Sequence, residues 1–158
     1  MNWLSWIFSG LVATLALSTL LATSYGLGLT RMNIPYLLGT FVTPNRERAR
    51  LYGFIAHVFN GWAFSILYVF IFQATHRANW RFGLLLGLAH GLFALTVGMS
   101  LLPSLHPRMA SERNGPVAQR QLEPPGFMAL NYGYQTPLSV FLSHAVFGAI
   151  LGSLYRLA

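Results

Sequence analysis

Histidines within apolar runs are the residues of this sequence best suited to chemistry, because an ionisable side chain inside a membrane marks a candidate functional site. His57, in GFIAHVFNG, and His144, in LSHAVFGA, each stand four residues before a glycine. Asn60 follows His57 by about one helical turn, so the two side chains share a helix face. Because histidines on facing helices can ligate haem iron from both sides, the pattern predicts a haem b site formed by His57, His144, His90 and Asn60.

A divalent metal ion is a second possible occupant of this site, because imidazole suits Zn, Cu and Fe. Its predicted ligands are His57, His144, His106 and Glu123. A metal needs three or four protein ligands, and the sequence has no H-x-x-x-H motif. Neutral histidines can instead hydrogen-bond between helices, and a proton or quinone role also fits. No catalytic residue is predicted, since no nucleophile motif such as G-x-S-x-G occurs.

The depth of each histidine decides which of them can meet. At about 1.5 Å per residue, His57 and His144 lie roughly 10 Å below the same membrane face. His106 is expected at that face, and His90 deeper, towards the opposite one. The site hypothesis therefore depends on the His57 and His144 rings meeting at one height.

The composition predicts the elements that hold these residues. Of 158 residues, 54% are hydrophobic and 8% charged, whereas a soluble domain has about 25% charged residues. A bilayer-spanning helix needs about 20 apolar residues, and the blocks 3–29, 51–73, 82–102 and 137–155 meet that length. We therefore expect one integral membrane domain, residues 1–158, with an all-α fold: a bundle of four transmembrane helices, a short interfacial segment at 33–42 and a long loop at 103–135.

Charge predicts the orientation of the chain. All ten basic residues are arginines, against three acidic residues. They lie between the apolar blocks and form no basic face, so nucleic acid is not an expected partner. Most arginines fall in the first and third loops, whereas Arg77, Arg81 and Arg156 lie on the other side. The positive-inside rule then places loops 1 and 3 in the cytoplasm and both termini outside.

Small residues predict where the helices touch, because close packing through them drives association in lipid. The expected packing positions are Gly53, Gly61, Gly83, Gly87, Gly91, Gly148 and Gly152. The histidines lie on or beside the same helix faces. Thr43-Pro44 and Thr136-Pro137 resemble helix starts, with Thr as N-cap and Pro at the first helical position.

Several stretches of the sequence are similar to those of a known group. LLPSLHPRMASE, LEPPGFMALNYG, TPLSVFLSHAVFGAILGSLY and NGWAF together resemble short, four-helix bacterial membrane proteins to which no activity is assigned. The resemblance covers most of the chain from about residue 30. It implies four spans and placement in the bacterial inner (cytoplasmic) membrane, and it assigns no residue a role.

The short chain, its few polar groups and its small-residue faces favour a small non-catalytic integral membrane protein. We expect an accessory or structural subunit that packs within a larger membrane complex, with lipids, other membrane subunits or further copies of itself as partners. The alternative is a haem- or metal-binding four-helix membrane protein that uses its intramembrane histidines in electron transfer or metal handling.

Overall fold

The computed structural model describes residues 1–111, 115 and 118–158, and within them the chain is helical and forms no strand. The predicted all-α class is therefore confirmed. The helices are α1 (Trp3–Gly26), α2 (Ile34–Gly39), α3 (Arg46–Thr75), α4 (Trp80–Phe93), α5 (Met99–Leu105) and α6 (Thr136–Leu154). A π-helical segment, Ala94–Gly98, joins α4 to α5, and a kinked 3₁₀ segment, Phe127–Tyr132, precedes α6.

Four helices are long and apolar enough to cross a membrane: α1, α3, the continuous helix Trp80–Leu105, and α6. Their ends differ from the predicted blocks. The third helix runs about one turn further towards the loop, and α3 begins at Arg46 rather than at 51. Hydropathy finds only the apolar part of a helix, whereas Arg46, Arg48 and Arg50 continue α3 as exposed helical residues.

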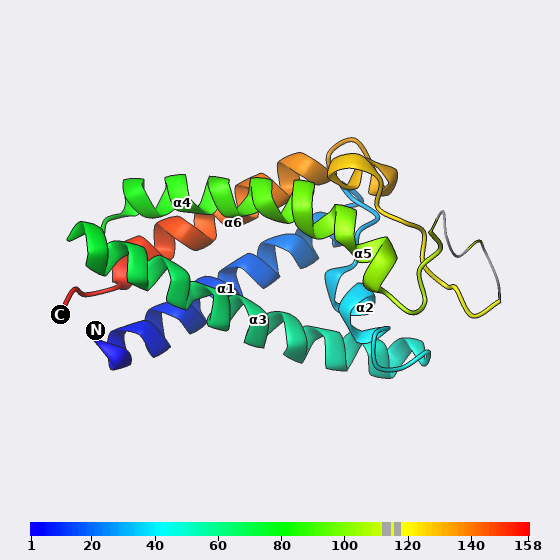
Figure 1. The fold of residues 1–158 in the computed structure, drawn as a ribbon, viewed down its shortest axis with the longest axis horizontal. Helices are drawn as coiled ribbons and strands as arrows, with labels where there is room; N and C mark the ends of the chain where they lie inside the picture. The colour runs from blue at the N-terminus through cyan, green and yellow to red at the C-terminus, as the bar shows by residue number, and fades with distance from the viewer. Residues whose placement is uncertain (112–114, 116–117) are drawn as a thin grey trace.

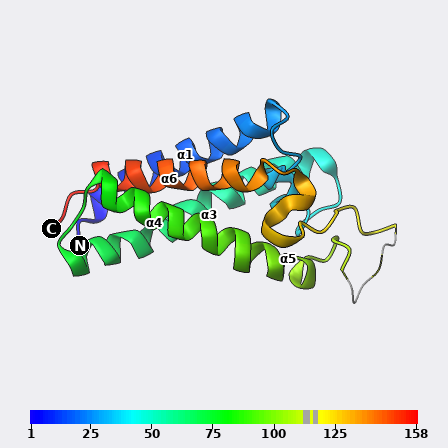
Figure 2. The ribbon, with the colours of Figure 1, turned by 90° about the horizontal axis from the view of Figure 1, so that it is seen from above.

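The four long helices lie side by side, with both chain termini at one end of the molecule (Figure 1). Helix α6 packs against α1 and α4, while α3 packs against α1 and α2 (Figures 1 and 2). A tight turn joins α3 to α4, and from there the two helices diverge towards the other end (Figure 1). The short helix α2 and the segments around α5 lie at that second end.

Helices α4 and α6 approach each other through glycines. A methyl group on Gly83 would overlap the carbonyl oxygen of Gly148, and one on Gly87 would overlap that of His144. The other glycines of this contact are Gly91 and Gly152. Only a residue without a side chain lets two backbones come this close, so the glycines fix the height at which α4 meets α6.

Helix α3 uses its own glycines in the same way. Gly61 lies against the side chain of Thr14 on α1, and Gly53 against the backbone carbonyl of Pro35 on α2. In return, Gly39 of α2 lies against the carbonyl of Ala49. These contacts press α2 onto the first turns of α3 and leave no room for a side chain between them.

Asparagine starts most of the helices. The side chains of Asn2, Asn33, Asn45 and Asn79 each accept a hydrogen bond from the backbone N–H three residues later, the usual N-cap arrangement. The expected Thr43-Pro44 start is therefore wrong, because Asn45 caps α3. At α6 the expected start is off by one residue, because Gln135 is the N-cap, Thr136 is the first helical residue and Pro137 the second. The Thr136 hydroxyl bonds to Thr30.

Candidate functional site

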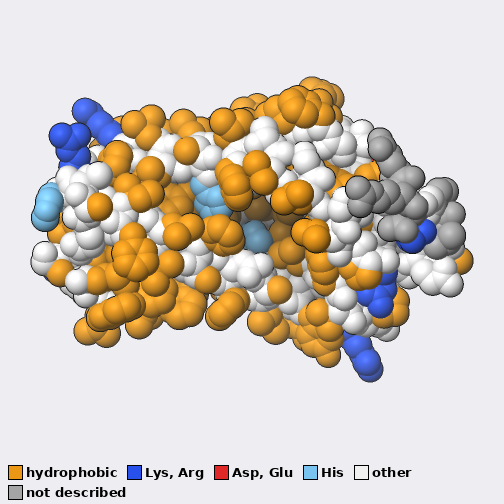
Figure 3. All heavy atoms as spheres, in the orientation of Figure 1, with side chains coloured by type: hydrophobic (Ala, Val, Ile, Leu, Met, Phe, Trp, Pro, Cys, Tyr) orange, Lys and Arg blue, Asp and Glu red, His pale blue; other side chains and the backbone are white. Residues whose placement is uncertain are grey.

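Three of the predicted site histidines come together at one pocket. His57 on α3, His90 on α4 and His144 on α6 line a cavity of about 280 Å³, here called the histidine pocket. Figure 3 shows histidine side chains around a hollow at the centre of an otherwise apolar face. Asn60, the fourth residue of the predicted cofactor site, also lines this pocket.

One hydrogen bond of His144 fixes the tautomer of its neutral ring. Its Nδ1 lies 2.9 Å from the carbonyl oxygen of Val140. A carbonyl only accepts, so Nδ1 carries the proton and Nε2 keeps its lone pair. The ring is held from the other side by α4, because Gly91 packs against it. The side chain is buried, with 8% of its surface exposed.

The partner of His57 is a hydroxyl group and not a carbonyl. Its Nδ1 lies 3.0 Å from the hydroxyl oxygen of Ser18 on α1. Ser18 has one proton, which it donates to the carbonyl of Thr14 at 2.8 Å. When Ser18 donates to Thr14, which is the shorter of its two contacts, its oxygen accepts the His57 Nδ1–H and the Nε2 of neutral His57 is unprotonated.

His90 differs because the shorter contact of its partner hydroxyl is to the imidazole ring and not to the carbonyl. The Tyr68 hydroxyl lies 3.0 Å from His90 Nδ1 and 3.3 Å from the carbonyl oxygen of Leu86. When Tyr68 donates to Leu86, His90 donates through Nδ1. When Tyr68 donates to Nδ1, the His90 proton is on Nε2. His90 can therefore present either an acceptor or a donor to the pocket.

The rings of His90 and His144 touch edge to face, with centroids 4.9 Å apart. The sequence placed His90 deeper than His144, and that expectation is wrong. The glycine contacts explain the difference, because Gly87 and Gly91 bring the middle of α4 level with His144. Phe64 of α3 lies next to His90 on another side, with ring centroids 5.2 Å apart.

The Nε2 atoms of the three histidines have no hydrogen-bond partner within the part of the chain that the structure describes. Among those residues, the buried side-chain nitrogen or oxygen that lacks a partner is Nε1 of Trp62. The histidine Nε2 atoms are therefore not fully enclosed by protein. All three histidines line the histidine pocket, and His57 also lines a neighbouring cavity. For a ligand in the pocket, the Nε2 of neutral His144 is an acceptor, whereas His57 and His90 bond hydroxyl groups and can each change tautomer.

The remaining walls of the pocket are apolar and include Leu17, Leu21, Leu37, Phe93 and Val140. The lining residues that are exposed, Asn60, Phe64, Phe93 and Gly98, belong to α3 and to the α4–α5 helix. The mouth thus lies where these two helices diverge. The π-helical segment Ala94–Gly98 borders the mouth, and such segments occur frequently at functional sites.

The other two predicted metal ligands lie outside the histidine pocket. Nδ1 of His106 accepts the backbone N–H of Arg108, and Nε2 donates to the carbonyl of Leu37, both at 3.0 Å. Glu123 pairs with Arg31 at 3.4 Å. Among the described residues no group of three or more His, Cys, Asp or Glu side chains could hold a metal ion.

Burial lowers the pKa of His106, and the charge of Arg108 acts in the same direction, while the hydrogen bond to Leu37 opposes both. The neutral ring uses both nitrogens to join the end of α5 to α2. A second proton, on Nδ1, would point at the backbone N–H of Arg108, and the hydrogen bond between these two atoms would be lost. His106 is thus a structural link in its neutral form.

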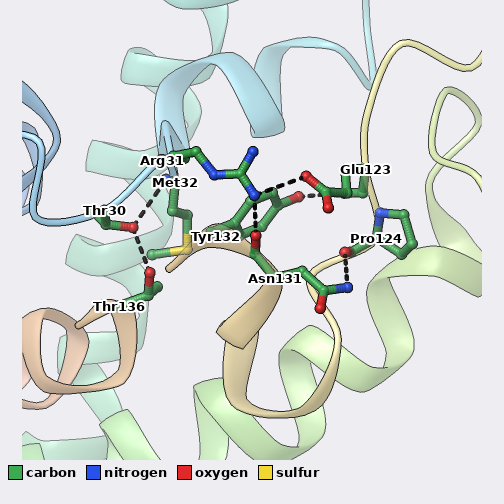
Figure 4. A network of polar contacts seen from close by, with 8 residues as sticks. All are labelled: Thr30, Arg31, Met32, Glu123, Pro124, Asn131, Tyr132 and Thr136. Carbon is green, nitrogen blue, oxygen red and sulfur yellow. Dashed lines mark hydrogen bonds and ion pairs between the residues drawn. The ribbon is translucent and has the colours of Figure 1, made fainter. Parts of the chain in front are cut away.

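Figure 4 shows a polar network that joins the segment before α6 to the segment after α1. The hydroxyls of Thr30 and Thr136 lie 2.7 Å apart, and Thr30 also accepts the backbone N–H of Met32. The Tyr132 hydroxyl donates to the carbonyl of Glu123 at 2.6 Å. The network fixes Met32, which lines the histidine pocket.

Electrostatics of this network keep Tyr132 neutral. Burial and the nearby Glu123 raise the pKa of Tyr132 to about 12, although Arg31 acts in the opposite direction. The phenol therefore remains a donor at physiological pH. The Arg31 guanidinium donates to the backbone carbonyl of Asn131 and ion-pairs with Glu123.

The comparisons with known proteins suggest no function, so a functional proposal must be based on the geometry of the site. No protein-family model, no curated protein and no solved structure matches the chain. Sequence reasoning missed Ser18 and Tyr68, the partners that orient His57 and His90, because each lies on a different helix from its histidine. Their polar character inside apolar runs is the signal that could have found them.

Proposed function

We propose that the protein is a small, non-catalytic subunit of the bacterial cytoplasmic membrane that binds a lipid-soluble quinol in the histidine pocket. A quinol is an aromatic ring with two hydroxyl groups and an apolar tail. The observation that carries the proposal is the set of unpartnered Nε2 atoms from three helices around one apolar pocket. Apolar pockets with a few convergent polar groups are the usual form of small-molecule sites.

The hydrogen-bonding groups of the pocket favour a quinol over other small apolar ligands. Unprotonated Nε2 atoms of His57 and His144 accept from hydroxyl groups, as a quinol requires. His90 can accept from the quinol or, in its other tautomer, donate to the carbonyl of the oxidised quinone. Phe64 and Phe93 supply aromatic surface for the ring.

Pocket size supports a single-ring headgroup. Sites for drug-sized ligands have about 300–1,000 Å³, and the histidine pocket has about 280 Å³. The metal hypothesis lacks a group of three ligands among the described residues. The mouth between α3 and the α4–α5 helix would leave the quinol tail in the surrounding lipid.

Orientation and assembly are part of the same proposal. The arginine distribution supports loops 1 and 3 in the cytoplasm and both termini outside, with α2 and the Phe127–Tyr132 segment at the membrane interface. Large apolar side chains remain exposed along the long helices. They suit lipid and also contact with other subunits, in keeping with an accessory role.

Binding of a short-chain ubiquinol to the purified protein in detergent tests the proposal. His57→Asn and His144→Asn keep an N–H near the Nδ1 position but remove Nε2, so each should weaken binding about tenfold, as for a hydrogen bond worth about 1.4 kcal/mol. His76→Asn is the matched control, because His76 is exposed and Asn tolerates its left-handed backbone (φ 51°).

The dimethyl ether of the same quinol has no hydroxyl protons, and it should bind more weakly than the quinol. Equal affinity for quinol and ether, or equal binding by all three variants, would contradict the proposal.

A further inference from the structure

A second candidate binding site adjoins the histidine pocket, along the contact of α1, α2 and α3. Two adjoining cavities, of about 380 and 390 Å³, share Leu21, Ala22, Ile34, Pro35 and Phe54. We call this continuous space the Arg50 groove. Tyr25 and Arg50 line its outer end, and Ser18 and His57 its inner end.

The groove has the dimensions of a site for one chain of a lipid. Arg50 and His57 are seven residues apart on α3, which corresponds to about 10 Å along a helix. Tyr25 and Ser18 span the same length on α1, which runs in the opposite direction. The two helices thus flank the same length of groove, and α2 closes one side because Gly53 of α3 packs directly on Pro35.

The charges at the outer end favour an anion. The Arg50 side chain forms no hydrogen bond or ion pair with the described residues, among which the ion pair found joins Arg31 to Glu123. Arg46 and Arg48 are exposed nearby, with Glu47 as the one acidic residue of α3. Tyr25 and Asn33 also line this end of the groove, and the Asn33 side chain accepts the backbone N–H of Tyr36.

We propose that the Arg50 groove binds an anionic phospholipid, with the phosphate at Arg50 and the first part of one acyl chain between α1 and α3. An arginine at the level of the headgroups attracts anionic lipid, and the groove behind it is lined by apolar residues. This site requires the membrane placement proposed above but not the quinol.

Native mass spectrometry of the full-length protein tests this site. The protein in detergent is mixed with phosphatidylglycerol and phosphatidylcholine of identical acyl chains. We expect selective retention of phosphatidylglycerol. Arg50→Gln should reduce it about fivefold, the effect of one arginine at a membrane surface. Arg48→Gln removes the same charge but lies two residues away, on another helix face, and should have little effect.

A variant that leaves the charge unchanged tests the acyl-chain part of the groove. Ala22→Phe fills the shared part of both cavities and should reduce phosphatidylglycerol retention, whereas Ala74→Phe, on the exposed far end of α3, should not. Millimolar inorganic phosphate should not displace the lipid. Equal losses in Arg48→Gln and Arg50→Gln, displacement by phosphate, or unchanged retention in Ala22→Phe would each overturn the proposal. Retention of the lipid by His144→Asn would separate this site from the quinol site.

Discussion

His90 and His144 meet edge to face at a centroid distance of 4.9 Å, although they are 54 positions apart in the chain. The contact exists because Gly87 and Gly91 allow α4 to lie directly on the backbone and side chain of His144. The histidine pocket therefore depends on the glycine contact as much as on the histidines. This dependence leads to the first prediction.

Gly87→Ala should destabilise the protein by about 1–3 kcal/mol, the usual cost of forcing extra volume into a packed interface. The added methyl group would overlap the carbonyl oxygen of His144. Denaturant unfolding in detergent, followed by circular dichroism, measures the change. Gly98→Ala is the control in the same continuous helix, because a methyl group there meets open space. If both variants unfold alike, the α4–α6 contact is not as close as described.

In the network before α6, buried and exposed contacts should differ in their effect on stability. Thr30 and Thr136 are 3% and 0% exposed, so Thr136→Val should cost about 1 kcal/mol through the lost hydrogen bond. The Arg31–Glu123 pair is 69% and 49% exposed, and Glu123→Gln should cost less, since exposed pairs contribute about 0–1 kcal/mol. The same unfolding assay compares the two variants. A larger loss of stability in Glu123→Gln than in Thr136→Val would contradict this prediction.

Acid should weaken the link between α2 and the end of α5. The pKa of His106 is lowered in the folded protein, whereas an unfolded histidine titrates near about 6.5. The contribution of neutral His106 to the free energy of unfolding is thus fully present above about pH 6.5. It is lost as the pH falls towards the lower pKa of the folded state.

Hydrogen exchange of peptides from α2 and α5, corrected for the intrinsic rate, should show less protection at pH 5.5 than at pH 7.5. His106→Gln cannot titrate and should reduce this pH difference. Unchanged protection of the wild-type peptides over this range would refute the role of neutral His106.

The sequence was sufficient to predict the helical class and the four long apolar helices. In lipid every backbone group must be satisfied within its own segment, so long apolar runs without breaks indicate helices. Helix starts were harder, because Asn45 caps α3 while Thr43-Pro44 had the stronger pattern.

The site was predictable only in part. Apolar context indicated His57, His144 and Asn60, but depth along a helix did not reveal that α4 and α6 cross at Gly87. Helix crossing depends on pairs of small residues from distant parts of the chain. His106 was predicted as a metal ligand from its position alone, and its hydrogen bonds to Leu37 and Arg108 depend on how α2 folds back onto α3.

The most direct test of the histidine pocket is the ¹⁵N chemical shift of the imidazole nitrogens in histidine-labelled protein at neutral pH. We predict that Nε2 of His57 and of His144 is unprotonated, and that both signals shift when a short-chain ubiquinol is added but not when its dimethyl ether is added. Protonated Nε2 atoms in the free protein, or ¹⁵N chemical shifts that do not change when the quinol is added, would contradict a pocket built from hydrogen-bond acceptors.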